Sequence, residues 1–474
     1  MKKAKRILLI EPDYKNKYPP LGLMKISTYH KEKGDDVFFY KGFSSELKEK
    51  IWDRIYISTL FTFYWNKTIK TIKYYSKSVN SLSDIFVGGV MATLIESEIK
   101  KEINVNVVKG LLNKKGKLGY KDDDNIDYLT PDYSIINPKT NSILDYSYPT
   151  NNSYIAYATR GCIRNCEFCA VPIIEPIFTN NLSIAKQVEG IRKKYGEKRH
   201  LLLLDNNVLA SKKFPEIIEE IKNAGFGKGA KYTSNKNGKK RKITRYVDFN
   251  QGIDARLLTK EKMKLLSEIA ISPIRIAFDD IKYKHIYIKK VRLAAEFGIK
   301  ILSNFLLFNF RDSPDDLYER MKINIELNEE FERNGYKSRI WSFPMKFAPI
   351  KGEYCKNRKY VGNQWNKKYL RGMQCILLAT HGVIGPKKIF FEKAFGKDLY
   401  EFKKILSLPE PYIIYRNEHK KNGDVKNLEK MINSLNNKQS MLLRKIILDN
   451  CFRNLNDLTC DKNILDILKV YKQR

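Results

Sequence analysis

The chain of 474 residues has a hydrophobic fraction of 43% and a formal net charge of +35 at pH 7. Its length allows two or three domains, and its apolar content excludes a chain that is disordered throughout. The positive charge has two open interpretations. One is a polyanionic partner such as RNA or DNA; the other is a lysine-rich composition without such a partner, because the cations are spread along the sequence.

The N-terminal stretch "MKKAKRILLIEPDY" begins with basic residues, but its apolar run covers only Ile7–Ile10. That run is too short for a secretory signal, and no other stretch approaches the length that spans a membrane. The seven cysteines form no pattern typical of a disulfide framework. We therefore expect a soluble, cytoplasmic protein without a membrane partner.

Residues 1–135 alternate short apolar runs with amphipathic segments, which predicts a Rossmann-like parallel sheet with helices on both faces. A helix is expected from Leu21 to a stop at Gly34. Gly88-Gly89 follows a predicted strand, and either the close approach of a ligand or a tight turn explains the pair. The predicted strands are 7–10, 37–40, 55–58, 85–87 and 105–108.

Residues 136–152 are rich in Asn, Asp, Pro and Ser and are expected to be a linker. In residues 153–350 strand and helix patterns alternate again, which predicts a partial or full parallel (β/α) barrel, similar to a TIM barrel, with catalytic groups on the loops after strands. One of its helices is expected between a Ser183 cap and Gly196. The predicted strands of this region are 154–159, 201–204, 246–249, 274–278, 299–307 and 340–347.

The stretch "GFGKGAKYTSNKNGKKRKITR" at residues 225–245 interrupts the barrel pattern, and its Gly/Lys-rich composition predicts a mobile loop. Such a loop could contact a phosphate backbone, cover the barrel mouth or simply be solvated. Residues 351–474 lose the strand pattern and are expected to form a basic, mainly helical C-terminal region.

Cysteines crowd in "TRGCIRNCEFC", where Cys162, Cys166 and Cys169 have the spacing Cys-x3-Cys-x2-Cys directly after a predicted strand. Thiolates with this spacing on one loop can bind three irons of a [4Fe–4S] cluster. No fourth cysteine is close in sequence, so one iron would stay open to a substrate or cofactor. Zinc is disfavoured because no second Cys/His pair of comparable spacing follows.

Here the sequence resembles the radical S-adenosylmethionine (SAM) superfamily, over roughly residues 154–350. The resemblance implies that Cys162, Cys166 and Cys169 ligate the cluster and that its open iron chelates SAM through the amino and carboxylate groups. It further implies reductive cleavage of SAM to a 5′-deoxyadenosyl radical, which abstracts hydrogen from a substrate. A flavodoxin or ferredoxin is the expected electron donor.

The same resemblance directs attention to polar residues at the strand ends. "LLLLDNN" ends in Asp205, Asn206 and Asn207, where the family contacts the SAM amino group. Arg256 in "VDFNQGIDARLL" suits the SAM carboxylate, although a structural pair of Arg256 with Asp254 is equally open. Asn304 is expected to face the barrel interior. The full set of expected cofactor-binding residues is Phe168, Asp205, Asn206, Gln251, Asp254, Arg256 and Asn304.

The N-terminal region resembles the cobalamin-binding-like domain that often precedes such barrels, through "YPPLGLMKISTYHKEKGDDV" and "DIFVGGVMATL". The resemblance implies that the glycine pair lies near the cobalamin nucleotide tail. The Asp-x-His-x-x-Gly signature of the lower axial ligand is absent, and "EPDYKNKYPP" stands in its place. Cobalamin binding and a degenerate domain that shapes the substrate site are both open.

The predicted function is that of a radical SAM enzyme that modifies an unidentified substrate, with methylation or another C–H functionalisation of RNA or a peptide favoured. A small-molecule substrate and a non-enzymatic nucleic-acid-binding protein with a structural Fe–S cluster are the alternatives. A tRNA methylthiotransferase is disfavoured because no cysteine precedes Cys162. The other cysteines are expected to be buried and structural: Cys355, Cys375, Cys451 and Cys460.

Overall fold

The computed structural model describes residues 3–123, 126–180, 182–236 and 238–472. The chain forms two compact units, Met1–Ser272 with Ala348–Tyr360 and Pro273–Phe347 with Val361–Arg474. The division after Ser272 falls inside the stretch predicted as one barrel. The boundary predicted near residue 135 falls inside the first unit.

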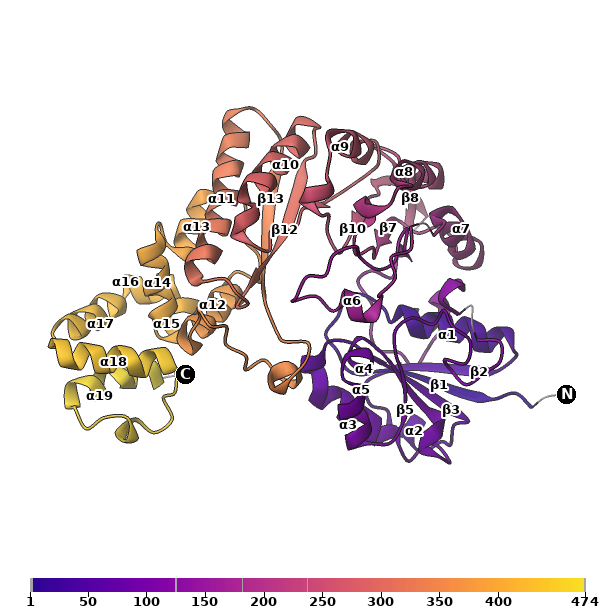
Figure 1. Ribbon diagram of the computed structural model, residues 1–474, viewed down its shortest axis with the longest axis horizontal. Coiled ribbons are helices and arrows are strands. Elements are labelled where there is room, and N and C mark those ends of the chain that lie inside the picture. Colours follow the sequence, from indigo (N-terminus) through magenta and orange to yellow (C-terminus); the bar gives the residue numbers. More distant parts are fainter. Residues whose placement is uncertain (1–2, 124–125, 181, 237, 473–474) are drawn as a thin grey trace. The chain divides into compact units, whose positions relative to one another are not determined.

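A five-stranded parallel sheet lies in the first unit, with the strand order β2-β1-β3-β4-β5 (Figure 1). All five predicted strands of this region are confirmed. The order is that of flavodoxin-like sheets rather than the Rossmann order, and it reverses between β1 and β3, where such sheets bind ligands. The strands are β1 (Arg6–Glu11), β2 (Asp36–Lys41), β3 (Arg54–Thr59), β4 (Ile85–Gly89) and β5 (Asn106–Val108).

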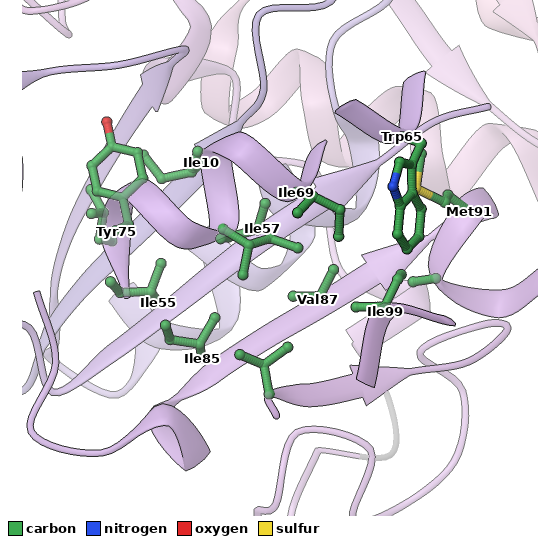
Figure 2. Packing of buried hydrophobic residues seen from close by; sticks show 14 of the residues in the cluster. Ile10, Ile55, Ile57, Trp65, Ile69, Tyr75, Ile85, Val87, Met91 and Ile99 are labelled. Atoms are coloured by element: carbon green, nitrogen blue, oxygen red, sulfur yellow. The ribbon is translucent and has the colours of Figure 1, made fainter. Parts of the chain in front are cut away.

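Both faces of this sheet are covered, as the continuous apolar strands require. Alternate residues such as Ile10, Ile57 and Val87 pack with helices α3 (Trp65–Tyr75) and α5 (Glu96–Glu102) in one core (Figure 2). The opposite face lies against α1 (Leu21–Glu32), where His30 Nε2 is 3.0 Å from the hydroxyl of Tyr56. The predicted helix is therefore confirmed, and Gly34 follows its end with a φ of 80°.

The segment predicted as a linker is part of the packed first unit. Tyr148 is fully buried and donates a hydrogen bond to the Glu11 carboxylate, which also pairs with Lys41 at 2.6 Å. Upstream, the Tyr133 hydroxyl donates to the Ser153 carbonyl at 2.8 Å. Buried tyrosines with satisfied hydroxyls fix this stretch, and its role as a linker between domains stays a prediction.

A second parallel sheet of the first unit has the order β10-β7-β6 and consists of β6 (Ser153–Ala156), β7 (His200–Leu203) and β10 (Val247–Phe249). The helix predicted after Ser183 is confirmed, because the Ser183 hydroxyl accepts from the Lys186 amide and Gly196 ends the helix. The remaining helices here are α2 (Ser45–Lys48), α4 (Val90–Leu94), α6 (Val171–Ile174), α7 (Ile184–Tyr195), α8 (Phe214–Ile221) and α9 (Lys260–Ser267).

Residues 225–245 contain an antiparallel hairpin, where a mobile loop was predicted. Strand β8 (Lys231–Lys236) pairs with β9 (Lys239–Thr244). The expectation was wrong because the lysines hide a two-residue alternation. Tyr232 and Ile243 face each other across the strands and are half-buried, while their neighbours are exposed.

The second unit contains a parallel sheet of β11 (Ile274–Arg275), β12 (Ile301–Phe308) and β13 (Arg339–Lys346), with helices α10 (Lys284–Glu296) and α11 (Pro314–Arg333) between the strands. Strand and helix alternate in both three-stranded sheets, as predicted. The closed or partial barrel itself stays a prediction.

The C-terminal region is helical, as predicted, and no helix among the described residues is long and apolar enough to cross a membrane. Cys355 and Cys375 are buried as expected, whereas Cys451 and Cys460 are exposed, so the expectation of burial was wrong for these two. The helices are α12 (Lys367–Ala379), α13 (Lys388–Phe395), α14 (Leu399–Ser407), α15 (Glu410–Ile414), α16 (Arg416–Lys421), α17 (Asp424–Asn433), α18 (Asn437–Asp449) and α19 (Lys462–Lys472).

The glycine pair that ends β4 allows a test of whether its backbone requires glycine. Gly89 has a φ of 105°, and a Cβ there would overlap the carbonyl oxygen of Thr59, whereas a Cβ on Gly88 would meet Val108 Cβ at an ordinary 3.6 Å. We expect Gly89→Ala to lower the free energy of unfolding by about 2–4 kcal/mol. Gly88→Ala, the matched control, should change it by less than about 1 kcal/mol in urea titrations. Equal effects of the two substitutions would contradict this account of Gly89.

Candidate functional site

The cysteine loop leaves β6 and leads into α6, all within the first unit. Cys162, Cys166 and Cys169 are half-buried. A turn within the loop is closed by the Cys169 amide, which donates to the Cys166 carbonyl at 2.9 Å. The loop thus presents three thiols from one short turn at the carboxyl end of a parallel strand, where ligands bind in such sheets.

The start of the loop is clamped by the segment that follows α6. Arg160 and Thr179 exchange two backbone hydrogen bonds, at 3.2 and 2.9 Å. A Cβ on Gly161, whose φ is 73°, would lie only 2.6 Å from the Ile177 carbonyl oxygen. The Gly161 amide also donates to Glu175 Oε2 at 2.6 Å. Only glycine fits here, so the backbone position next to Cys162 is fixed.

A buried network of charges, which we call the Arg160 network, lies beside this clamp. Arg160 pairs with Glu175 and Asp127, each at 3.2 Å, and its guanidinium lies 3.9 Å from the ring centroid of Tyr157. Asp127 pairs in turn with Lys25 of α1 at 3.2 Å. Burial raises the pKa of Asp127, but Lys25 and Arg160 outweigh it and hold the pKa below its usual range. Two cations and two carboxylates therefore balance in a desolvated site.

Asp205, predicted to bind a cofactor, instead supports the backbone of the loop. Its carboxylate accepts from the Ala158 amide at 3.0 Å, the Thr159 amide at 2.5 Å and the Thr159 hydroxyl at 2.7 Å. It is fully buried. Burial outweighs these hydrogen bonds and raises the pKa of Asp205 to about 6. The structure thus places Asp205 as a positioning residue.

The two asparagines after Asp205 lie at the cysteine loop. Asn206 Nδ2 donates to Glu175 Oε2 at 2.9 Å. Asn207 is buried, its Nδ2 is 3.5 Å from Cys162 Sγ, and its Oδ1 has no hydrogen-bond partner among the described residues. A second N–H, from the Arg164 backbone, donates to the same sulfur at 3.3 Å. Hydrogen bonds of this kind tune cluster-binding sulfurs.

Asp254 and Arg256 form an ion pair with each other. This is the structural pairing that was the alternative to an Arg256 contact with the SAM carboxylate. Arg256 Nε and Nη2 donate to the Asp254 carboxylate at 2.8 and 3.0 Å. Arg164 of the cysteine loop donates to the same carboxylate at 3.0 Å. Burial raises the pKa of Asp254, but both arginines outweigh it and lower the pKa. Asp254 therefore anchors the cysteine loop through Arg164.

The remaining predicted residues lie in different settings. Phe168 is half-buried on the cysteine loop, and Gln251 is exposed in the turn after β10. Asn304 belongs to the second unit and is buried, with Nδ2 donating to the Tyr287 hydroxyl of α10 at 2.5 Å. The expectation that Asn304 faces an interior was wrong. It lies on the helix-covered face of β12, because side chains alternate between faces and the register decides which one.

Sequence reasoning assigned no role to Arg160, Glu175, Asp127 or Arg164, although Arg160 and Arg164 flank the first cysteine. The position of Arg160 just before the cysteine motif and of Arg164 within it is the sequence signal that could have identified these two residues. Glu175 and Asp127 join the site through tertiary contacts, which no spacing in the sequence reveals.

The side chains of the loop are of the type that ligates iron–sulfur clusters. No three His, Cys, Asp or Glu side chains within the described ranges, the three cysteines included, are gathered as a preformed metal-binding group. The loop offers three cysteine side chains, N–H donors to the Cys162 sulfur and the unpartnered oxygen of Asn207. Thiolates with hydrogen-bonded sulfurs are the ligands of [4Fe–4S] clusters.

The carboxyl edge of the five-stranded sheet also carries ligand-compatible groups. The Ser58 hydroxyl oxygen at the end of β3 is shielded from solvent and has no hydrogen-bond partner among residues that the structure describes. Phe61 and Phe63 stack at 5.2 Å just beyond it, and Phe61 is 53% exposed. An unsatisfied hydroxyl at the end of β3 and an exposed ring shortly after it in the chain are compatible with a ligand that has polar and apolar parts.

No protein-family model and no curated protein matches the chain. Among solved structures, the chain is similar to the radical S-adenosylmethionine methyltransferase TsrM from Kitasatospora setae with cobalamin and a [4Fe–4S] cluster bound. The TM-score is 0.48 and the identity 12%, over 79% of this chain and 78% of that one.

A second similar structure is the cobalamin-dependent S-adenosylmethionine radical enzyme OxsB with aqua-cobalamin bound, with a TM-score of 0.47 and 14% identity over 99% of this chain and 79% of that one. A third is Streptococcus suis SuiB bound to S-adenosylmethionine, with a TM-score of 0.28 and 12% identity over 43% and 40% of the two chains. Likenesses of this size carry no argument about the chemistry of the chain.

The raised pKa of Asp205 predicts a pH-dependent effect on stability. The native state holds this proton more tightly than the unfolded chain, so Asp205 destabilises the fold as pH rises from about 4 to about 6. We expect Asp205→Asn to remove this penalty. The difference in unfolding free energy between variant and parent should shift by about 3 kcal/mol in the variant's favour between pH 4 and pH 7.

Urea titrations at both pH values measure this shift. Asp36→Asn, at an exposed position of β2, is the control and should show no such difference. The prediction would be contradicted if the unfolding free energies of Asp205→Asn and of the parent differed by the same amount at both pH values.

Proposed function

We propose that the chain is a radical SAM enzyme whose cluster is bound by Cys162, Cys166 and Cys169. When bound and reduced, a [4Fe–4S] cluster with one open iron supplies the electron that cleaves SAM to methionine and a 5′-deoxyadenosyl radical. The observation that carries the proposal is the clamped loop of three thiols at the end of β6, with N–H donors at the Cys162 sulfur.

The chain's own residues hold this loop in place. Arg160 and Glu175 fix the backbone before Cys162, and Asp205 fixes the end of β6. The unpartnered Oδ1 of Asn207 is the best-placed acceptor for the SAM amino group. Phe168 and Gln251 remain proposed contacts of SAM, whereas Asn206, Asp254 and Arg256 are proposed to act by positioning the loop and its neighbours.

We propose the carboxyl edge of the five-stranded sheet as the site of cobalamin. Ser58 and the exposed ring of Phe61 support this assignment. Residues 12–20 contain no histidine, so that loop supplies no lower axial ligand. If cobalamin does not bind, the edge is proposed to shape the substrate site instead.

Methylation or another C–H functionalisation of RNA or a peptide is the proposed reaction, with flavodoxin or ferredoxin as the electron donor. A small-molecule substrate is the alternative within the same chemistry. A nucleic-acid-binding protein with a structural cluster is the alternative outside it, and SAM cleavage separates the two.

The first test is anaerobic SAM cleavage by the reconstituted, reduced chain. We expect 5′-deoxyadenosine from the parent protein and a loss of at least about 100-fold in the Cys162/Cys166/Cys169→Ala variant, because cleavage requires the cluster. Accompanying S-adenosylhomocysteine would indicate methyl transfer. Equal yields from both proteins, or a fully loaded cluster that gives no product with any candidate RNA or peptide, would contradict the proposal.

A second test concerns the Arg160 network. Glu175→Gln leaves Arg160 with one carboxylate fewer in a buried site, and we expect iron content after reconstitution to fall to about half or less. Arg160→Lys keeps the charge but not the fork of donors and should alter the electron paramagnetic resonance spectrum of the reduced cluster with a smaller loss of iron.

The matched control for Glu175 is Glu189→Gln, at an exposed position of α7 whose partner is Arg192. This variant should load iron like the parent. Unchanged loading and an unchanged spectrum in both network variants would show that the network does not position the loop.

A further inference from the structure

The hairpin of β8 and β9 is firmly attached to the first unit. Each strand has six residues, so the ribbon is about 20 Å long. Arg245 follows β9, is buried, and donates to Glu197 Oε1 and to the Lys198 carbonyl, both at 2.7 Å. Its guanidinium also lies 3.9 Å from the ring centroid of Phe226. These contacts fix the base of the ribbon.

The ribbon has two unlike faces. Residues directly opposite in an antiparallel pair point to the same face. Tyr232, Ser234 and Ile243 are half-buried on one face. The other, which we call the open face, consists entirely of exposed residues: Lys231, Thr233, Asn235, Lys240, Lys242 and Thr244.

The open face carries cations and neutral polar groups and no acidic residue. Lys240 lies opposite Asn235, and Lys242 lies opposite Thr233. Lys240 and Lys242, the two lysines that β9 contributes to the open face, therefore each have a hydroxyl or amide group across from them. A glutamate in that place would stabilise the ribbon by about 0.2–1 kcal/mol. A need for solubility therefore does not explain why no glutamate lies opposite these lysines.

The ribbon's cations also lack salt-bridge partners, unlike many others in the same unit. Arg192 pairs with Glu197 at 2.6 Å, and Lys33 with Asp122 at 2.6 Å. Across the part of the chain that the structure describes, no salt bridge involves the ribbon cations Lys231, Lys239, Lys240, Arg241 and Lys242. Their field extends into solvent, where it attracts anions.

We infer that the open face binds the phosphate backbone of structured RNA, which deepens the proposed function by naming its partner class. Lys240 and Lys242 lie about 7 Å apart along one strand, so they can neutralise separate phosphates. Thr233 and Asn235 can donate to phosphate oxygens. Their oxygens can also accept from the ribose 2′-hydroxyl, a donor that DNA lacks.

Equilibrium binding of the full chain to a fluorescent RNA hairpin tests the inference. We expect the Lys231/Lys240/Lys242→Gln variant to bind about tenfold or more weakly at about 0.1 M salt and to lower the slope of log K against log salt by about 2–3. The control, Lys212/Lys260/Lys264→Gln, removes the same charge from exposed lysines of the same unit and should stay within about twofold of the parent.

Three outcomes would overturn the inference: an equal loss in the control variant, no saturable RNA binding by the parent protein, or equally tight binding of a DNA hairpin of the same sequence or of polyglutamate. The last of these would assign the face to DNA or to an acidic peptide instead.

A single isosteric substitution tests the choice of RNA over DNA. Thr233→Val keeps a β-branched side chain on the exposed strand and removes only the hydroxyl. We expect about fivefold weaker binding of the RNA hairpin, as for one lost hydrogen bond. A loss of the same size with the DNA hairpin, or no loss with RNA, would refute a 2′-hydroxyl contact.

Failure of this inference and failure of the proposed function are distinguishable. RNA binding needs no cluster, and the ribbon variants should keep the iron content of the parent. RNA binding without SAM cleavage would leave the ribbon assignment standing and remove the enzyme proposal. SAM cleavage without RNA binding would leave the enzyme proposal standing and remove the ribbon assignment.

Discussion

The charge balance around Arg160 is the constraint on which the candidate site depends. Two carboxylates and two cations are removed from water together, and each would be strongly unfavourable there without its partners. Arg160, Gly161 and Cys162 are consecutive in the chain, so fixing Arg160 also restricts the backbone at Cys162. The position of the first thiol is therefore set by electrostatics, while Lys25 of α1 ties the same network to the five-stranded sheet.

Two further carboxylates of the site also hold the backbone and side chains around the cysteine loop in place. Asp205 holds the end of β6, and Asp254 holds the cysteine loop through Arg164. Both lie after parallel strands, where groups that contact a ligand are usually found. Both carboxylates are engaged with the protein itself, whereas Asn207 Oδ1 has no hydrogen-bond partner among the described residues.

Cations in the interior of the first unit have carboxylate partners, whereas cations on the open face of the ribbon do not among the described residues. Inside the first unit, buried cations such as Lys25 and Lys41 each have a carboxylate partner. On the open face of the ribbon, Lys231, Lys240 and Lys242 stand opposite hydroxyl and amide groups and have no carboxylate partner among the described residues. The ribbon thus carries a local group of cations on an ordered surface, although the cations of the chain as a whole are spread along the sequence.

The sequence by itself determined the strands of the two parallel sheets of the first unit, the ends of α1 and α7, and the loop that carries the three cysteines. These features are local: apolar runs, caps, glycines and cysteine spacing act within a few residues. Only the tertiary structure decided the rest. The face of Asn304 depends on strand register, and the roles of Asp205 and Asp254 depend on segments far away in sequence. The ribbon escaped prediction because lysines on both of its strands concealed an alternation that becomes visible only when Tyr232 and Ile243 are paired.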